Sequence, residues 1–525
     1  MVQTFSEGIY TMANDPHQVG FFVGEVLEGT ARKYPEKTAL IFRDETLTFR
    51  ALDEAVSSLA RYLQKERVRQ GDRVALLLPN SLAFALGYYA TQRAGAVTVV
   101  LDARLKGREL RGVLKDADVT LLITHHRLMP DIAEVLSEFA RIPLWVAGGK
   151  GEQSFEEKLA SPPPDFTQPR RDPEDDALIL YTSGSTGEPK GVVLNHINLA
   201  QFPRCAAEIF KTHSDSVWGC ILPMSHISGP IYLNEIADKG SAMVIFDQFN
   251  PVTWLEGIQK YRITIFHGVP TVFHLLLGVP DLQKYDTRSV NLVGMMGTTV
   301  PVSLMRAFKR SQPHVNVVQG YGLTETSPMI TMTELHHADA KMASIGTAAP
   351  GVEVKIIDEE GREGAEGEAG EIVTRGPHVM KGYFRRPEAT AERVRAGWLY
   401  TGDVGRRDSD GYYYHLGRKD DMIITGGLNV YPTEVENALC EHPDVQEAVV
   451  FPISNPKRGS VIGAAVVLRP GSETRERELL TFLRANLANF KVPQRIAIHQ
   501  SLPRTAIGKV IRDPTVLLSD GGAKG

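Results

Sequence analysis

The stretch from Tyr181 to Gly191 constrains the fold of this chain more than any other feature. It reads YTSGSTGEPKG and follows the apolar run Ala177–Leu180. A strand that ends in such a loop directs backbone N–H groups, hydroxyls and one ammonium group toward a common point, as a polyphosphate requires. We therefore predict a phosphate-binding loop. Its expected contacts are Thr182, Ser183, Gly184, Ser185, Thr186, Gly187 and Lys190.

This loop differs from the Walker loop of nucleotide-hydrolysing proteins. The Walker pattern needs a glycine, four further residues and then Gly-Lys-Ser/Thr, whereas Pro189 stands five positions after Gly184. A surface linker is the alternative interpretation. It would explain the glycine and serine residues, but it would explain neither the preceding strand nor the single lysine, Lys190.

The stretch resembles the signature of the adenylate-forming enzymes, which include acyl-CoA and aryl-CoA synthetases, the adenylation domains of peptide synthetases, and luciferases. The resemblance implies an α/β fold with a large N-terminal domain of two α/β subdomains and a small β subdomain. A small, mobile α+β C-terminal domain should follow. We place the domains at 1–419 and 420–525, with a hinge near Asp420.

Length and composition agree with a multi-unit globular enzyme. A chain of 525 residues is too long for one core, and 42% hydrophobic with 23% charged residues is ordinary for such proteins. The net charge of -5 gives no electrostatic reason to expect nucleic acid as a partner. Three distant cysteines suggest a reducing compartment, and no signal peptide or transmembrane segment is visible. We expect a cytoplasmic protein, and a homodimer is left open.

The expected pattern of helices and strands changes along the chain. Alternating helices and strands from about 20 to 147 predict a largely parallel sheet, followed by a turn-rich connector at 148–176. A second α/β unit should run from the phosphate loop to about Leu335. Short, glycine-rich strands from Ser344 to Tyr414 predict a small β unit. The last hundred residues are long enough for a separate domain, with helices at 432–441 and 474–488.

A second motif, QGYGLTET, covers Gln319–Thr326 and follows a short apolar run. Strand, glycines, hydroxyl and carboxylate form the order expected where backbone approaches a nucleotide at the carboxyl end of a sheet. The resemblance implies that Tyr321 stacks near adenine, Thr324 contacts the α-phosphate, and Glu325 holds Mg²⁺, for which one carboxylate with phosphate oxygens suffices. Alone, the motif could be a helix N-cap formed by Thr324. The expected nucleotide contacts here are Gln319, Gly320, Tyr321, Gly322 and Thr324.

Asp403 lies in a predicted turn, Tyr400–Asp403, where a carboxylate can accept both hydroxyls of a ribose. The resemblance assigns this role to Asp403 and gives Arg418 the ribose or the phosphates. An isolated Thr-Gly-Asp is more often only a turn, so the assignment depends on the family. The resemblance also makes Lys509 the charge that drives the first half-reaction, and a surface lysine is the alternative.

A hinge near Asp420 is chemically reasonable, because Lys509 must leave before a thiol can attack the same carbonyl carbon. In related acyl-CoA synthetases the small domain rotates, and residues matching Gly426 and Gly427 then line a pantetheine tunnel. A plain β-turn is the alternative for these glycines. Further candidates for the CoA nucleotide are Phe490, Lys491 and Arg495. Val492 and Gln494 replace basic residues of some aryl-CoA ligases, which leaves the 3′-phosphate contacts open.

The segment Pro223–Gly229 should decide which acid is activated. Amino-acid-adenylating domains place an aspartate near here, whereas this chain has His226, which resembles the gate of the acyl pocket in CoA ligases. A core histidine is the alternative. The rest of the pocket and the adenine cleft should be lined by Val269, Pro270 and 293–299, including Gly297, Thr298 and Thr299. Methionines here make a deformable, apolar lining, so we expect a fatty or aromatic acid with an uncharged tail.

The resemblance thus implies an AMP-forming acyl-CoA synthetase that uses ATP, Mg²⁺ and coenzyme A. A carboxylate attacks the α-phosphorus of ATP, and the CoA thiol then displaces AMP; proximity and charge stabilisation supply the catalysis. Three alternatives remain: an enzyme that loads a carrier-protein phosphopantetheine thiol, a luciferase-like oxygenase, and a non-catalytic nucleotide sensor. The last is disfavoured by the presence of Lys190, Glu325, Asp403 and Lys509.

Overall fold

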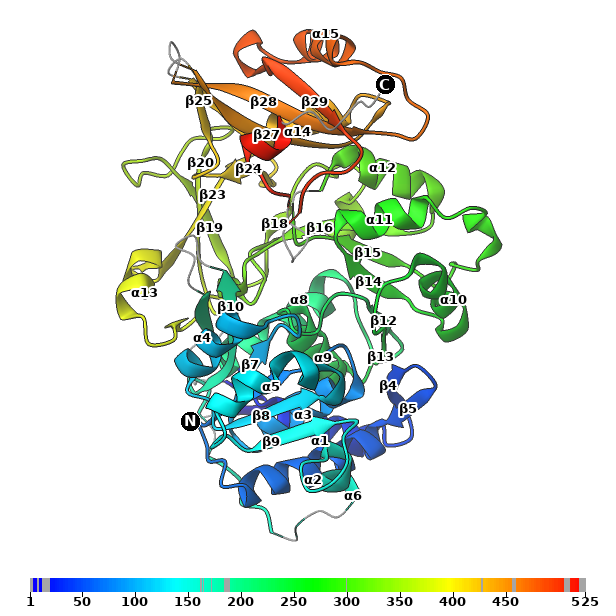
Figure 1. Ribbon diagram of the computed structural model, residues 1–525, viewed down its shortest axis with the longest axis vertical. Coiled ribbons are helices and arrows are strands. Elements are labelled where there is room, and N and C mark those ends of the chain that lie inside the picture. Colours follow the sequence, from blue (N-terminus) through cyan, green and yellow to red (C-terminus); the bar gives the residue numbers. More distant parts are fainter. Residues whose placement is uncertain are drawn as a thin grey trace.

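The computed structural model describes residues 3–6, 9–11, 19–160, 163, 165–170, 172–183, 189–298, 300–425, 428–455, 459–504 and 510–518. These residues form two large α/β units, a small β unit and a C-terminal α+β unit. In Figure 1 the first unit (blue to cyan) lies at the bottom, the second (green) at the right, and the C-terminal sheet (orange to red) at the top. The predicted fold class is confirmed. A further small sheet near the N-terminus has strands β1 (Gln3–Ser6), β2 (Ile9–Thr11) and β3 (Val19–Phe21).

The first large sheet has seven strands in the order β21-β11-β10-β7-β6-β8-β9. Every residue of β7 is buried, as expected for a parallel strand covered by helices on both faces. The strands are β6 (Arg73–Leu77), β7 (Val97–Leu101), β8 (Leu121–His125), β9 (Leu144–Ala147), β10 (Asp176–Ser183), β11 (Pro189–Asn195) and β21 (Gly382–Tyr383). The helices of this part are α1 (Val23–Lys33), α2 (Phe49–Lys65), α3 (Leu82–Arg93), α4 (Gly107–Ala117), α5 (Met129–Glu138) and α6 (Phe155–Ala160).

The second large sheet has nine strands in the order β18-β17-β16-β15-β14-β12-β13-β4-β5. The strands are β4 (Thr38–Phe42), β5 (Glu45–Thr48), β12 (Val217–Cys220), β13 (Ala242–Ile245), β14 (Ile265–Gly268), β15 (Leu292–Met295), β16 (Asn316–Tyr321), β17 (Thr331–Met332) and β18 (Thr347–Ala348). The helices are α7 (His196–Leu199), α8 (Gln201–Ile209), α9 (Ser228–Lys239), α10 (Pro251–Tyr261), α11 (Pro270–Leu277) and α12 (Val302–Ser311).

The two large units interleave in sequence, which differs from the expected division at the phosphate loop. Strands β10 and β11, on either side of that loop, belong to the first sheet, because β10 pairs in parallel with β7. The early hairpin β4–β5 instead joins the second sheet, where Met243 of β13 pairs with Leu40 of β4. Pairing between strands so far apart in the chain depends on packing that local patterns do not report.

The small β unit contains β19 (Glu353–Ile357), β20 (Gly370–Arg375), β22 (Val394–Arg395), β23 (Trp398–Arg407) and β24 (Tyr413–Arg418), with helix α13 (Pro387–Arg393). The prediction that Tyr400–Asp403 forms a turn is wrong. These residues lie inside β23, which pairs with β20 and with β24. Gly402 has a φ of +71° and the register shifts between Val404 and Gly405, so the strand is irregular where the turn was expected.

The C-terminal unit has its own sheet and its own core. Its elements are β25 (Ile423–Thr425), β26 (Leu428–Val430), α14 (Pro432–Cys440), β27 (Val445–Asn455), β28 (Gly459–Leu468), α15 (Glu476–Asn486), β29 (Arg495–His499) and α16 (Pro514–Leu517). Helices α14 and α15 bury Leu439 and Leu479 against this sheet. The domain boundary and the hinge near Asp420 stay predictions.

The cysteines behave as core residues. Cys205, Cys220 and Cys440 are buried and free, as expected. Among the helices of the described residues, none has both the length and the apolar character needed to cross a bilayer.

Candidate active site

The phosphate loop connects two antiparallel strands. Thr182 of β10 pairs with Lys190 of β11, and the hydroxyl of Thr182 lies 3.5 Å from the carbonyl oxygen of Lys190. The expected contacts Gly184, Ser185, Thr186 and Gly187 lie outside the described residues, and so does the side chain of Ser183. The strands on either side of the loop therefore form a β-hairpin in the first sheet, and the strand before the loop continues past Leu180.

Tyr383 joins this hairpin to the second motif. Strand β21, which carries Tyr383, pairs with β11 through Val192 and Val193. The hydroxyl of Tyr383 donates a hydrogen bond to Oε1 of Glu325 across 2.8 Å, and Nζ of Lys190 lies 5.4 Å from the centre of the Tyr383 ring. Three distant segments thus bring a cation, a phenol and a carboxylate together.

Burial and the contact with Glu325 together keep the Tyr383 hydroxyl protonated. Burial first, and then the charge of Glu325, raise the pKa of the Tyr383 hydroxyl to about 12. The phenol therefore remains a hydrogen-bond donor at neutral pH, and it occupies one oxygen of the Glu325 carboxylate. Tyr383 was not expected from the sequence. No local pattern indicates its role, because it lies nearly 200 residues after the hairpin with which its strand pairs.

The nucleotide motif is built from the end of β16 and a short 3₁₀ turn at Thr324–Thr326. Two of its glycines are required by close packing. A Cβ atom at Gly322 would lie 1.5 Å from the carbonyl oxygen of Pro328, and one at Gly320 would lie 2.4 Å from Sδ of Met332. The backbone N–H of Leu323 donates to the hydroxyl of Thr326 across 2.8 Å. Thr326 rather than Thr324 therefore caps this turn.

The side chain of Gln319 serves the fold. Its Nε2 donates to the carbonyl oxygen of Met342 across 2.8 Å in a buried position. The amide group that was expected to contact the nucleotide therefore already forms a hydrogen bond within the protein. Only the backbone of Gln319, which accepts from the N–H of Thr333 at 3.0 Å, continues the sheet toward Tyr321.

Asp403 is the most strongly held of the predicted site residues. It is 3% exposed, and it accepts a hydrogen bond of 2.6 Å from the hydroxyl of Tyr321. Nε of Arg418 and Nε2 of His415 lie 3.3 Å and 3.6 Å from its other oxygen. Asp403 and Arg418 are direct partners across β23 and β24, so sheet pairing fixes this contact.

The charges around Asp403 keep it ionised despite its burial. Burial alone would raise the pKa of this carboxyl, but the hydrogen bonds and charges of His415 and Arg418 outweigh that effect and lower it. Burial and the Asp403 charge raise the pKa of the Tyr321 hydroxyl well above its usual value. His415 was missed by sequence reasoning. Its ring lies 5.7 Å from that of Tyr321, and only the pairing of β23 with β24 brings it to the site.

His226 lies in the exposed turn that precedes α9, near the carboxyl end of β7. Burial would raise the pKa of Asp102, which follows β7, but hydrogen bonds from Arg104 and the charge of His226 lower it. His226 is therefore not a core histidine. Gly297, with a φ of +89°, and Thr298 are exposed at the end of β15, whereas Thr299 lies outside the described residues.

Lys509, Gly426 and Gly427 also lie outside the described residues. Their flanking segments are placed: Arg504 and Val510 form an antiparallel bridge, and in Figure 1 the red chain on either side of them runs down toward β18. Burial, followed by the charges of Arg469 and Arg504, lowers the pKa of His274 on α11 to about 4. The C-terminal unit therefore approaches the second large unit at α11.

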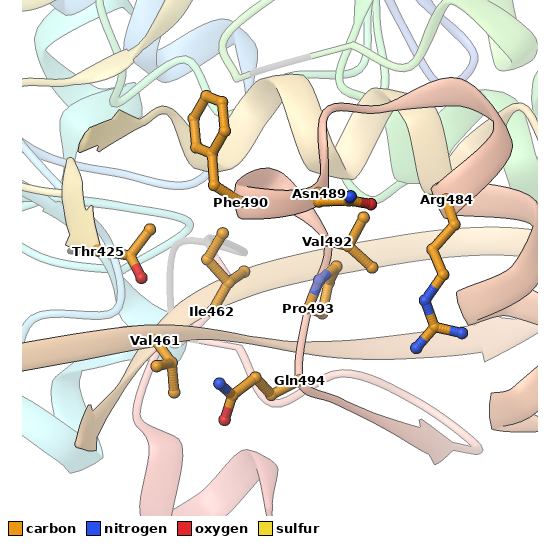
Figure 2. Close-up of a pocket in the computed structure, with 9 residues that line it drawn as sticks. All are labelled: Thr425, Val461, Ile462, Arg484, Asn489, Phe490, Val492, Pro493 and Gln494. Atoms are coloured by element: carbon orange, nitrogen blue, oxygen red, sulfur yellow. The ribbon is translucent and has the colours of Figure 1, made fainter. Parts of the chain in front are cut away.

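A cavity of about 460 Å³ lies in the C-terminal unit, beside the expected pantetheine tunnel. It is lined by Thr425, Val461, Ile462, Arg484, Asn489, Phe490, Val492, Pro493 and Gln494 (Figure 2). The candidate Phe490 is 37% exposed at its wall. The candidate Lys491 instead pairs with Glu434 at 2.6 Å. Arg484 was missed, because only the packing of α15 places it here.

Glu325 fits the expected magnesium role. It belongs to no group of three close metal-ligating side chains within the described ranges; Glu334, His336 and His337 form such a group elsewhere. Mg²⁺ needs only one or two carboxylates when phosphate oxygens complete its coordination. The Tyr383 hydroxyl bonds one oxygen of Glu325, so the second oxygen suits that requirement.

Comparisons with known proteins agree with this geometry. Residues 27–384 match the AMP-binding enzyme family, and residues 434–509 match the AMP-binding enzyme C-terminal domain. The chain is 36% identical to a long-chain-fatty-acid–CoA ligase of Bacillus subtilis, with 93% of this chain and 92% of the relative covered. It is also 36% identical to a feruloyl-CoA synthase of Amycolatopsis, over 92% and 96% of the two chains.

Solved structures give the same result. The anthranilate CoA ligase AuaEII in complex with anthranoyl-AMP has a TM-score of 0.88 at 27% identity, covering 94% of this chain and 96% of that one. ATP-bound MatB from Rhodopseudomonas palustris has a TM-score of 0.84 at 30% identity, covering 93% and 98%.

This chain therefore belongs to the AMP-binding enzyme family, whose fold it shares. Within that family it is an AMP-forming acid–CoA ligase, which uses ATP and coenzyme A.

Proposed function

We propose that this ligase activates a fatty or aromatic carboxylic acid with an uncharged tail. The carboxylate oxygen attacks the α-phosphorus of ATP, and pyrophosphate leaves with the electron pair of the broken P–O bond. The CoA thiol, once deprotonated, then attacks the acyl carbon and AMP leaves. Both steps need positioning and charge stabilisation rather than a protein nucleophile.

One observation carries the adenylation step: the buried, ionised Asp403, held by Tyr321 and Arg418. A fixed carboxylate of this kind can accept both ribose hydroxyls. In this proposal Tyr321 lies against the base, and Lys190 of the hairpin contacts the phosphates. Thr324 and Glu325 follow in the same motif, and in this proposal Thr324 contacts the α-phosphate and Glu325 would hold the metal.

Mg²⁺, when bound to Glu325 and the phosphates, would neutralise charge on the leaving pyrophosphate. The protein's own part is to hold the Glu325 carboxylate through the Tyr383 hydroxyl, at 2.8 Å. Lys509 is proposed as the mobile cation that meets the charge developing on the carboxylate and α-phosphate.

The second step uses the C-terminal domain, 420–525, turning about Asp420. In this proposal Gly426 and Gly427 admit the pantetheine arm, and the CoA nucleotide lies at Phe490. Arg484 supplies the 3′-phosphate contact, since it lines the cavity while Lys491 is paired with Glu434. A cytoplasmic location and a homodimer remain predictions from the sequence.

The character of the acid follows from the pocket entrance and from the named relatives. No carboxylate occurs between Pro223 and Gly229, so a substrate ammonium group has no counter-ion there. Relatives are named for a long-chain fatty acid, for ferulate and for indoleacetate, the last being a ligase of Aromatoleum aromaticum that is 33% identical. These acids share a largely apolar body, which agrees with the methionine-rich lining.

The test is a panel of carboxylic acids assayed in two ways: acid-dependent ATP–pyrophosphate exchange and CoA-dependent AMP release. The proposal predicts both activities with at least one fatty or aromatic acid. Exchange with amino acids alone would overturn the acid class. Exchange without CoA-dependent AMP release, but with transfer to a phosphopantetheinyl carrier protein, would favour the carrier-loading alternative.

A further inference from the structure

His267 lies at the centre of a cluster of aromatic rings contributed by α8 and its C-terminal end, by β12 and by α9. The residue, on β14, is 2% exposed. The ring centres of Phe202, Phe210, Trp218 and Tyr232 lie 6.4, 5.8, 5.3 and 5.5 Å from that of His267. These rings hold the imidazole in one orientation and exclude bulk water from it.

Within the part of the chain that the structure describes, only one nitrogen of this imidazole has a hydrogen-bond partner. Nδ1 lies 2.9 Å from the hydroxyl of Tyr232 on α9, whereas Nε2 has no hydrogen-bond partner among the described residues. Buried polar groups are paired in the great majority of cases, and leaving one unpaired is costly. A bound ligand can supply the partner that Nε2 lacks among the described residues. Burial lowers the pKa of His267 to about 3, so the ring is neutral at physiological pH.

The sheet has no side chain of its own beside this nitrogen, at Gly294; we call the space over this residue the hollow, although neighbouring side chains occupy it. His267 pairs across the sheet with Gly294, and Gly294 pairs with Val318. A Cβ atom at Gly294 would lie 2.5 Å from both Cδ2 of His267 and Cε of Met296, and 3.0 Å from Nε2. The imidazole and the end of the Met296 side chain thus converge over a position that has no side chain of its own.

Flexible side chains fill this hollow. One strand further, a Cβ atom at Gly320 would lie 2.4 Å from Sδ of Met332. Methionine side chains rotate easily and adapt to the shape of a ligand. The space over Gly294 and Gly320 can therefore open when Met296 and Met332 adopt other rotamers, without any change in the strands.

This hollow lies behind the nucleotide motif. Val318, in the row of His267, is three residues before Tyr321 on β16, which spans about 10 Å of extended chain. Helix α9, which carries Tyr232, begins two residues after His226. A small acid whose carboxylate reaches the α-phosphate site could therefore extend its tail to His267.

We propose that Nε2 of His267 forms the closed end of the acid pocket and hydrogen-bonds a hydroxyl group on the tail of the acid. This inference depends on the proposed function and narrows its acid class to hydroxyl-bearing acids. When Tyr232 donates to Nδ1, Nε2 carries the proton and needs an acceptor; in the other tautomer Nε2 is an acceptor and needs a donor. A hydroxyl serves either tautomer, whereas a wholly apolar tail leaves the nitrogen unpaired.

The test compares hydroxylated acids with their deoxy analogues. Two pairs suit it: 3-arylpropenoic acids with and without a para-hydroxyl, and medium-chain fatty acids with and without a terminal hydroxyl. CoA-dependent AMP release gives kcat/KM for each acid. For the wild-type enzyme, kcat/KM should be roughly tenfold or more higher for the hydroxylated member of at least one pair. Without the hydroxyl group, the buried Nε2 of His267 has no hydrogen-bond partner.

His267→Phe keeps an aromatic ring and removes both nitrogens. It should abolish that preference, because kcat/KM for the hydroxylated acid should fall roughly tenfold more than kcat/KM for the deoxy acid. Trp218→Phe is the matched control. It alters the same cluster and removes another buried N–H without a partner among the described residues, but it leaves His267 in place, so the hydroxyl preference should persist.

The outcomes separate the two proposals. Absence of preference in the wild type, or a preference that survives His267→Phe, overturns the inference while leaving the ligase assignment intact. Loss of preference in Trp218→Phe alone moves the contact to the indole and also overturns it. Absence of AMP release with every acid would instead contradict the proposed acid class, and the inference would fall with it. Thermal unfolding of each variant shows whether the fold is retained.

Discussion

The hydroxyl of Tyr321 donates a hydrogen bond of 2.6 Å to Asp403, a residue 82 positions later in the chain. This contact joins the nucleotide motif of the second large sheet to β23 of the small β unit. It fixes the distance between the expected adenine and ribose contacts. The site therefore depends on how these two units pack.

Replacing Asp403 by alanine should raise the KM for ATP on the order of 100-fold, because two charge-assisted hydrogen bonds to ribose are lost. ATP-dependent pyrophosphate exchange measures it. Tyr321→Phe removes only the hydroxyl and keeps the ring, so its effect should be roughly tenfold smaller. An unchanged KM for ATP in Asp403→Ala would remove Asp403 from the ribose site.

Tyr383→Phe should increase the Mg²⁺ concentration needed for half-maximal exchange by about threefold to tenfold, since Glu325 loses the hydrogen bond that orients it. A magnesium titration of pyrophosphate exchange gives this value. Tyr414→Phe is the control, because it removes a similar bond of 2.8 Å to Asp408, away from Glu325. Equal magnesium dependence in both variants would argue against the orienting role.

Lys509→Ala should lower acid-dependent pyrophosphate exchange by a factor of about 100 or more, which corresponds to a preorganised charge contact of roughly 3 kcal/mol. Thioester formation from supplied acyl-adenylate should fall much less. Gly427→Leu should show the reverse pattern, because a bulky side chain would obstruct the thiol arm. Parallel loss of both half-reactions in Lys509→Ala would refute its assigned role.

Arg484 is expected to distinguish CoA from 3′-dephospho-CoA. For the wild-type enzyme KM should be about tenfold lower for CoA, and Arg484→Ala should remove the difference, as expected for one charged contact to phosphate. Arg477→Ala, two turns earlier on α15 and outside the cavity lining, should keep it. If dephosphorylation does not change KM in the wild type, the 3′-phosphate binds elsewhere.

Glu235 should make the stability of the wild-type protein depend on pH. Its carboxyl is fully buried, neither oxygen has a hydrogen-bond partner within the described residues, and burial raises its pKa to about 8. A raised carboxyl pKa gives stability that is complete below the unfolded value, near 4.5, and that is lost as pH rises through about 8. The native protein therefore holds this group protonated at neutral pH.

Glu235→Gln, which imitates the protonated form, should gain stability relative to wild type by about 1.4 kcal/mol per pH unit between pH 5 and 8, and no more above that. Thermal unfolding across this range measures the difference. Glu256→Gln changes an exposed glutamate of α10 and should show no such trend. A pH-independent difference between Glu235→Gln and wild type would contradict the burial argument.

The sequence predicted the elements of this fold better than their pairing. The alternation of helices and strands expected between about 20 and 147 is confirmed, because hydrophobic period and turn residues are local signals. The interleaving of the two sheets was not predicted, since β4 pairs with β13 some 200 residues later. The turn expected at Asp403 is part of a strand. Gly402 has the positive φ that is typical of turns, although it lies inside β23.

The same limit applies to the site. Residues within motifs, such as Tyr321 and Glu325, could be named from the sequence because the motif carries them. Tyr383, His415 and Arg484 reach the site or the cavity only through sheet pairing and helix packing. His267 was equally invisible, because an unpaired nitrogen is a property of its surroundings.

A crystal structure of the enzyme with a non-hydrolysable ATP analogue tests the central claim most directly. We predict the ribose hydroxyls within hydrogen-bonding distance of Asp403, the base against Tyr321, and the phosphates between the β10–β11 hairpin and Glu325. A nucleotide bound away from Asp403, with the Tyr321–Asp403 hydrogen bond intact and no ribose hydroxyl within hydrogen-bonding distance of this carboxylate, would contradict this account.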